Sequence, residues 1–230
     1  MPYDDLPTVA AKPHRSLWAA ALVGHAEALS MLASRCAPAV YAWWRAQGSD
    51  PAEATARTGS YFAYLQAIEP PNPQEEDVER LQGFLLRRLT AFVAAGIPEA
   101  DPTVPRPGFE QAQTERRFAR EKAKDPEDIF HHRWALSALE LTMETLREEY
   151  LNERKGALFA LLPQFLSFSG TEERYEEVGK LVEMSSSGLR VAVYKFRQRY
   201  REVLRQIVGD TVRNEEAVDS ELTKLLVSAS

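Results

Sequence analysis

Basic side chains recur at helical spacing in residues 185–209, near the end of the chain. This stretch holds six lysines and arginines and one acid, Glu202. Four side chains would share one helical face, at positions i, i+4, i+7 and i+11: Arg190, Tyr194, Arg197 and Arg201. Cationic and phenolic groups on one helical face can bind phosphate oxygens and base edges, so their spacing predicts contact with nucleic acid.

Two helices joined by a tight turn are expected to position these side chains. The first helix is predicted from about Glu172 to Val182, and Gly179 within it would allow a second helix to cross closely. Ser185 or Ser186 can cap the second helix by accepting a hydrogen bond from a free backbone N–H. The apolar stripe of the second helix has spacings of three and four residues: Leu189, Val193, Phe196, Tyr200, Val203 and Ile207.

This arrangement predicts a helix-turn-helix that lays its basic second helix in the DNA major groove. A solvated amphipathic helix in a helical bundle is the alternative. Arg190, Tyr194 and Arg197 are expected to face base edges or phosphates. The remaining candidates are expected to contact phosphates: Ser185, Ser186, Lys195, Arg199 and Arg201.

The composition is that of an ordinary globular protein, with 230 residues, 44% of them hydrophobic and 27% charged. The net charge of −6 fits a protein whose positive charge is local and whose other surfaces meet a protein partner. One cysteine, Cys36, excludes an intramolecular disulfide. No apolar run approaches membrane-spanning length and no signal peptide is evident, so we expect a soluble, cytoplasmic protein with no membrane association.

Helical periodicity and the absence of strand patterns predict an all-α fold of two small domains. We expect an N-terminal helical domain over residues 14–95, a proline-rich linker over 96–124 and a C-terminal domain over 125–230. Pro98, Pro102, Pro105 and Pro107 prevent a continuous helix through the linker. Asp125-Pro126 is a typical helix start, with a capping residue followed by proline.

Metal binding and catalysis are not expected. Glu127 and His131 are at i and i+4, but the adjacent His132 would point to a different helical face and no further cluster completes a ligand set. The sequence contains no nucleotide-binding fingerprint, P-loop or serine-centred elbow. We therefore predict a protein that is not an enzyme and has no cofactor or metal.

The C-terminal half resembles a known family. The matching runs are Tyr175 to Leu181, Met184-Ser185, Leu189-Arg190 and Lys195 to Glu202. They resemble the promoter-reading domain of bacterial RNA polymerase sigma factors, and the extracytoplasmic-function group in particular. Two preceding runs resemble long-tailed members of that group: Arg133-Trp134-Ala135-Leu136 and Leu146-Arg147-Glu148-Glu149-Tyr150. The resemblance implies that this half recognises the upstream element of duplex promoter DNA.

The N-terminal half resembles the domain of that family that docks on core RNA polymerase and melts DNA. The resemblance runs through residues 38–42, 49–54, 61–62 and 83–86 and consists mostly of apolar spacing. Two departures stand out. The family's docking helix carries acids where this chain has Ala56 and Gly59-Ser60, and the family's basic, aromatic tract is replaced by residues 94–101, which contain no cation.

The docking stretch also suggests how polymerase binding could be regulated. Its expected partner-binding residues are Thr55, Arg57, Thr58 and Ser60. Because a phosphate adds about −1.5 to −2 charges, phosphorylation of one hydroxyl by a kinase would more than replace the missing acid. Simple loss of docking is the alternative, and an anti-sigma protein is a further candidate partner.

The sequence as a whole predicts a sigma-factor-like transcription initiation or regulatory protein that binds promoter DNA and core RNA polymerase. One alternative is a degenerate relative that binds DNA or another protein of a sigma pathway without initiating transcription. Another is a helical interaction scaffold that binds no nucleic acid.

Overall fold

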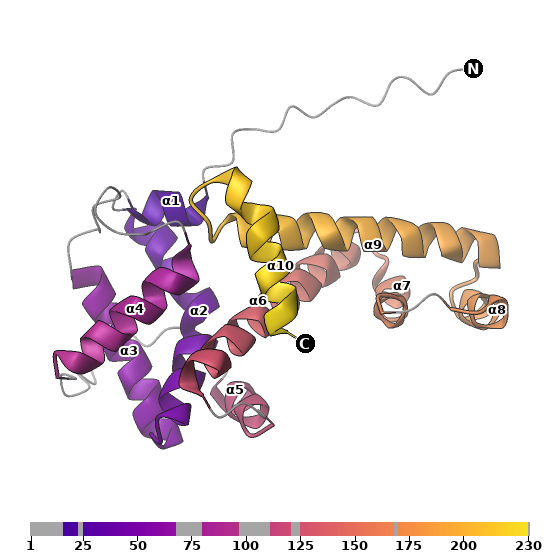
Figure 1. Ribbon diagram of the computed structural model, residues 1–230. Helices are drawn as coiled ribbons and strands as arrows, with labels where there is room; N and C mark the ends of the chain where they lie inside the picture. The colour runs from indigo at the N-terminus through magenta and orange to yellow at the C-terminus, as the bar shows by residue number, and fades with distance from the viewer. Residues whose placement is uncertain are drawn as a thin grey trace.

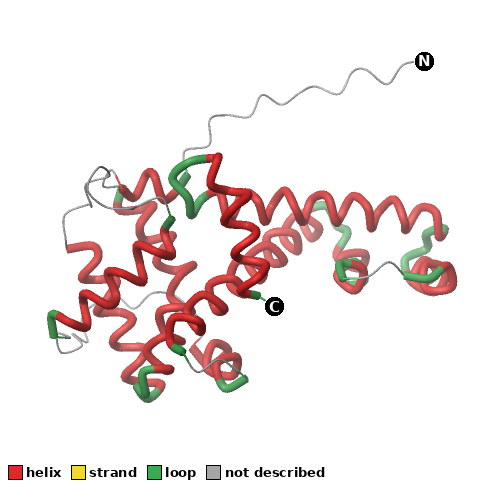
Figure 2. The backbone as a smooth tube through the Cα atoms, viewed as in Figure 1, coloured by secondary structure: helices red, strands yellow, loops and turns green. Residues whose placement is uncertain are grey.

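The computed structural model describes residues 16–22, 25–67, 80–96, 111–120, 125–167 and 170–229. Within these ranges all regular structure is helical apart from an isolated bridge between Arg80 and Val212, so the all-α prediction is confirmed (Figure 2). The first helices are α1 (Leu17–Leu22), α2 (Ala26–Ala46), α3 (Pro51–Ala67), α4 (Leu81–Ala94) and α5 (Gln111–Phe118). The others are α6 (Pro126–Asn152), α7 (Gly156–Phe159), η1 (Pro163–Phe165), α8 (Glu172–Leu181), α9 (Ser186–Gly209), η2 (Glu215–Ala217) and α10 (Val218–Ser228).

Helix α2 runs unbroken through Pro38. Proline inside a helix removes one hydrogen bond and costs about 3 kcal/mol, so a kink or an interruption at this position would be expected. The residues around Pro38 offset this cost because most of them are fully buried, among them Ala37, Val40 and Tyr41 at 0% exposure. Packing on both sides of the proline therefore keeps the helix continuous.

The first hydrophobic core lies among α1, α2, α3 and α4, and α6 completes it. Trp18, Trp44 and Tyr61 are buried there, and Phe130 and Trp134 join them from the first turns of α6. These two residues belong to the half of the chain expected to be a separate domain. The predicted division at 96–124 therefore does not separate two cores among the described residues. Residues 14–15, 23–24, 68–79, 97–110 and 121–124 of the expected domain and linker lie outside the described residues.

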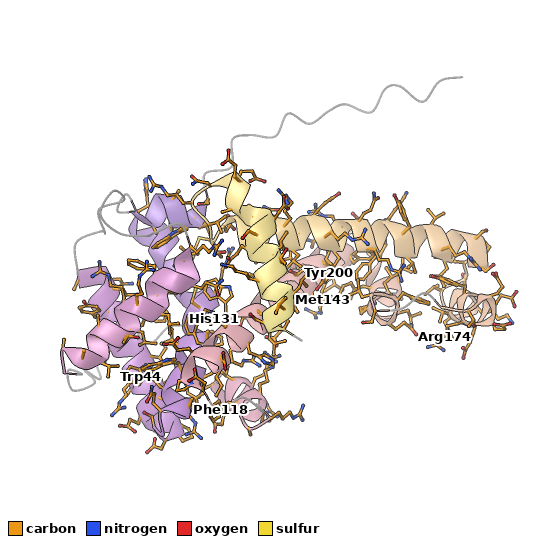
Figure 3. All side chains as sticks on the ribbon, viewed as in Figure 1. Trp44, Phe118, His131, Met143, Arg174 and Tyr200 are labelled. Carbon is orange, nitrogen blue, oxygen red and sulfur yellow. The ribbon has the colours of Figure 1, made fainter. Side chains whose placement is uncertain are left out.

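Two more cores also contain residues of α6. Leu146 is buried against α8, α9 and the segment around η1 in the second core. Ala135 is buried against the end of α9 and α10 in the third. Met143 and Tyr200, half-buried at the second core, lie where α6 and α9 run side by side (Figure 3). A single helix of 27 residues thus connects all three cores.

The segment after α9 is bonded to the N-terminal half. Trp18 N donates to Asp210 O at 2.9 Å, and Leu81 N donates to Thr211 O at 2.9 Å. The Arg35 guanidinium lies 3.0 Å from the Asp210 carboxylate. In Figure 1 the body formed by α1–α5 and α10 consequently sits at one end of α9, while α8 sits at the other.

A buried polar cluster joins α4, α6 and α10. Glu221 is 1% exposed and accepts a hydrogen bond from Gln82, whose amide oxygen lies 3.0 Å from Nδ1 of His131. Arg80 Nε lies 3.1 Å from the second oxygen of Glu221, an ion-pair contact without hydrogen-bond alignment. Burial raises the pKa of Glu221, and Arg80 opposes that rise. His131 is thus part of a structural network, and burial lowers its pKa.

Helix α5, expected as part of a linker, packs against α2. Its Glu115 accepts hydrogen bonds from Tyr41 at 2.5 Å and from Arg45 at 2.9 Å and 2.8 Å. The Arg45 guanidinium also stacks over the Phe118 ring, 5.0 Å from its centroid. These interactions lower the pKa of Glu115, mainly through Arg45. Residues 111–118 of the expected linker are therefore helical and docked on the N-terminal half.

Replacing Phe130 with alanine tests whether the two halves share one core. Deleting a buried phenylalanine side chain costs about 3–5 kcal/mol, and Phe130 is fully buried in the first core. We expect one thermal transition, lowered by roughly 10 °C, when unfolding is followed by circular dichroism and tryptophan fluorescence. Leu151→Ala, on the same helix but 49% exposed, is the control and should shift the transition far less. Two transitions, of which only one moves, would contradict the shared core.

Candidate nucleic-acid interface

Two capped helices and a short turn form the candidate interface. The side chain of Thr171 accepts a hydrogen bond from Arg174 N and starts α8. The Ser185 hydroxyl accepts a hydrogen bond from Gly188 N at 3.1 Å and starts α9. Capping side chains of this kind satisfy amide groups that lack a partner within the helix. The cap predicted at Ser185 or Ser186 is therefore Ser185, and Ser186 is the first helical residue.

The turn between the helices depends on Gly179. Met184 N donates to Gly179 O at 2.9 Å, and Glu183 adopts a left-handed backbone with φ of 54°. A Cβ atom built on Gly179 would lie 2.6 Å from the backbone oxygen of Met184. The sequence indicates close approach at Gly179, but the group that approaches is the carbonyl of the turn rather than a crossing helix.

The apolar face of α9 fixes its orientation against α8 and α6. Leu189, Val193 and Phe196 are at most 2% exposed, as the stripe predicts. They share the second core with Tyr175 and Val178 of α8. Because a close-packed core holds its side chains in defined positions, the opposite face of α9 is turned to solvent.

Three of the candidate DNA-binding residues are exposed and make no ion pair or hydrogen bond through their side chains to other described residues. Tyr194 is 61% exposed, and Lys195 and Arg201 are also exposed. Lys195 and Arg201 make no ion pair within the described ranges, so their charges face solvent. These three residues lie on the solvent-facing side of α9, as the helical spacing in the sequence predicts.

Arg190 is exposed but already has partners. Its guanidinium forms an ion pair with Glu172 at the start of α8 and stacks over the Tyr175 ring, 4.8 Å from the centroid. About half of the Arg190 side chain is exposed, at 48%. Arg190 is thus oriented by α8, and a phosphate or base would have to compete with Glu172 for it.

Arg197 and Arg199 connect α9 to the rest of the protein. Arg197 Nε donates to the backbone oxygen of Phe165 at 2.9 Å. Arg199 donates to Glu149 of α6 at 3.0 Å and 2.6 Å, and it also contacts Glu202 at 3.1 Å. The Arg199 guanidinium lowers the pKa of Glu149, and these acids raise that of Arg199. Both arginines, expected at the DNA, hold the helix in place in this structure.

Ser185 and Ser186 differ in what they can offer a ligand. The Ser185 hydroxyl is used by the cap and lies 3.1 Å from the Ser187 hydroxyl. Ser186 is half-buried. Sequence reasoning missed Val191 and Gln198, which are exposed on the same face of α9. Their positions opposite the apolar stripe would have predicted that Val191 and Gln198 are exposed.

The expected partner-binding residues on α3 do not form an exposed docking surface. Thr55 and Thr58 are 5% and 0% exposed, and each hydroxyl donates to the carbonyl four residues earlier, at 2.8 Å and 2.7 Å. The Ser60 hydroxyl oxygen is buried. Arg57 pairs with Glu53 and donates to the Ser49 hydroxyl at 3.0 Å. The burial of these hydroxyls argues against a kinase acting on the folded chain, and phosphorylation of α3 stays a prediction.

Comparisons of the chain with protein-family models, with curated proteins and with solved structures give no match. Within the described ranges, no group of three or more His, Cys, Asp or Glu side chains is arranged to hold a metal ion. None of the helices in the described part of the chain is long and apolar enough to cross a bilayer.

Gly179→Ala tests the turn that sets the angle between α8 and α9. The added methyl would overlap the Met184 carbonyl, and overpacking of this kind costs about 1–3 kcal/mol, so we expect lower stability in urea denaturation. Gly83→Ala is the matched control, because Gly83 also lies inside a helix but its nearest atom would be 3.9 Å away. Gly83→Ala should be neutral or stabilise by up to about 1 kcal/mol. Equal effects of the two substitutions would refute the close contact in the turn.

Proposed function

We propose that the protein is a transcription regulator that binds duplex DNA through α8 and α9, with α9 in the major groove. The observation that supports this best is the combination of a capped helix, a glycine-dependent turn and a second capped helix whose far face is exposed and basic. Recognition helices of this class enter the groove with their first turns, while the preceding helix crosses the backbone.

The distribution of charge around α9 also supports DNA binding. Lys195 and Arg201 have no ion-pair partner within the described residues, and Arg190 has only the half-exposed Glu172. Exposed ion pairs contribute about 0–1 kcal/mol, so phosphate can replace Glu172 at little cost. Three cations are thus available to phosphates, whereas Arg199 and Arg205 are each paired with two acids.

The resemblance to sigma factors suggests the process that this DNA binding serves, which is recognition of the upstream promoter element. Docking on core RNA polymerase is less well supported by α3. Its exposed acid, Glu53, is paired with Arg57, and two of its expected docking hydroxyls are buried. This observation favours the second candidate function: a sigma-like regulator that binds promoter DNA without initiating transcription itself.

The salt dependence of DNA binding tests the proposed interface. Each neutralised phosphate contributes about −0.9 to the log–log slope of affinity against salt, so three contacts predict a slope near −2.7. We expect this slope for the full chain and a labelled 20-base-pair duplex, measured by fluorescence anisotropy. Arg201→Ala should reduce its magnitude by about 0.9. Arg87→Ala, exposed on α4 in the opposite half, is the control and should leave it unchanged. No measurable binding at low salt would refute the proposal.

A transcription experiment separates the two candidate functions. The full chain is mixed with core RNA polymerase, purified by size exclusion and tested for run-off transcription on a duplex that it binds. Because α3 presents no unpaired acid among its described residues, we expect DNA binding without a stable polymerase complex and without a defined transcript. A stable complex that yields a discrete transcript would instead establish an initiating sigma factor.

A further inference from the structure

The exposed face of α9 carries two apolar side chains that the fold does not bury. Val191 is 54% exposed and Tyr194 is 61% exposed, and neither is a member of the three buried cores. They are one helical turn apart, in the first half of α9. Every residue of the predicted apolar stripe, by contrast, is buried or half-buried. The exposed pair is therefore a separate feature of the helix.

Folding stability does not account for a valine at this position. A β-branched residue loses side-chain freedom in a helix and has a lower helix propensity than lysine, arginine or glutamine. An exposed valine at 54% also gains little from burial. Val191 therefore leaves a compact apolar group open to a ligand at this point.

The polar residues around Val191 indicate what kind of ligand this is. Ser187 and Gln198 are exposed on the same face and can exchange hydrogen bonds with a partner. Lys195 and Arg201 border the face with positive charge. An apolar centre with hydrogen-bonding neighbours and cationic borders complements the DNA major groove, where the thymine methyl group is the apolar feature between base edges and phosphates.

We infer that Val191, together with the ring of Tyr194, contacts thymine C5-methyl groups and so selects thymines in the DNA that this protein binds. This inference rests on the proposed DNA binding through α9. Residues three apart on a helix are displaced by about 4.5 Å along its axis, slightly more than one base-pair rise of about 3.4 Å. The two contacts therefore fall on neighbouring base pairs, and the preferred element contains thymines at adjoining positions.

The test removes only the methyl groups. A duplex enriched by the full chain from a pool with 20 randomised base pairs is resynthesised with deoxyuridine in place of one thymine at a time, and affinity is measured by fluorescence anisotropy. Burial of one methyl group is worth about 0.8 kcal/mol, which is about fourfold in affinity. We expect a loss of about fourfold at one or two neighbouring thymines and no loss at the others.

Substitutions then assign the methyl contact to Val191. In Val191→Ala the thymine and deoxyuridine duplexes should bind equally at one of the sensitive positions, whereas Val191→Thr, which keeps one methyl group, should discriminate in part. Val227→Ala is the matched control, because this valine is 72% exposed on α10, and it should keep the fourfold difference. Val191 is exposed inside a helix, so circular dichroism should show no loss of melting temperature for Val191→Ala, since alanine has the higher helix propensity.

The outcomes separate this inference from the proposed function. Sequence-specific, salt-dependent binding in which deoxyuridine costs nothing at any position would overturn the methyl contact and leave DNA binding intact. It would also be overturned if Val191→Ala kept the full difference in affinity between the thymine and deoxyuridine duplexes. Binding of a protein partner by the surface around Val191, with DNA affinity unaffected by the substitution, would overturn it as well. Absence of any enriched duplex and of any salt-dependent binding would overturn both proposals together.

Discussion

The burial of α6 is the interaction on which the rest of the structure depends. Phe130 near its start and Leu146 near its end are both fully buried, in two different cores. Asp125 caps the helix and Pro126 begins it, so local interactions alone favour its first turn. Since helices pack through interdigitated side chains, α6 cannot slide against one core without disturbing the other. The position of α8 and α9 relative to α1–α4 depends on this helix, together with the bonds that the segment after α9 makes to the N-terminal half.

Ion pairs reduce the positive charge that α9 presents to solvent. Arg199 is paired with Glu149 from α6, and Arg205 with Glu215 and Asp219 from the segment that follows α9. These acids come from elements distant in sequence or on the far side of a turn, so counting charges within the helix overestimates its positive surface. What remains for an anion is concentrated at Lys195 and Arg201 and at the partly paired Arg190. This arrangement allows an acidic protein to present a local cationic face.

Local signals in the sequence predicted local structure well. The stripe from Leu189 to Ile207, the cap at Ser185 and the start at Asp125-Pro126 all depend on residues within a few positions of each other, and the structure contains all of them. The role of Gly179 could be predicted only in part. A glycine in the middle of a helix indicates that another group comes close to its backbone, but the sequence does not identify that group as the Met184 carbonyl.

Features that depend on distant contacts could not be predicted in the same way. The prolines after Ala95 indicate a loop, but they carry no information on whether Phe130 returns to the first core. Thr55 and Thr58 are polar and would be expected at the surface. Each can be buried because its hydroxyl donates a hydrogen bond to a carbonyl of its own helix. Arg197 and Arg199 lie on a basic face, but their partners come from 32 and 50 residues away.

The anchoring of α9 at its far end gives the candidate interface a fixed geometry. Asp210 and Thr211, just after the helix, accept backbone hydrogen bonds from Trp18 and Leu81, and Glu221 is enclosed with Gln82. A helix of 24 residues is about 36 Å long at 1.5 Å per residue. Figure 1 shows the start of α9 at the end of the helix that lies away from α1–α4, and the continuous helix sets its distance from them. A molecule bound to the N-terminal half would therefore be placed in a defined position relative to any duplex on α9.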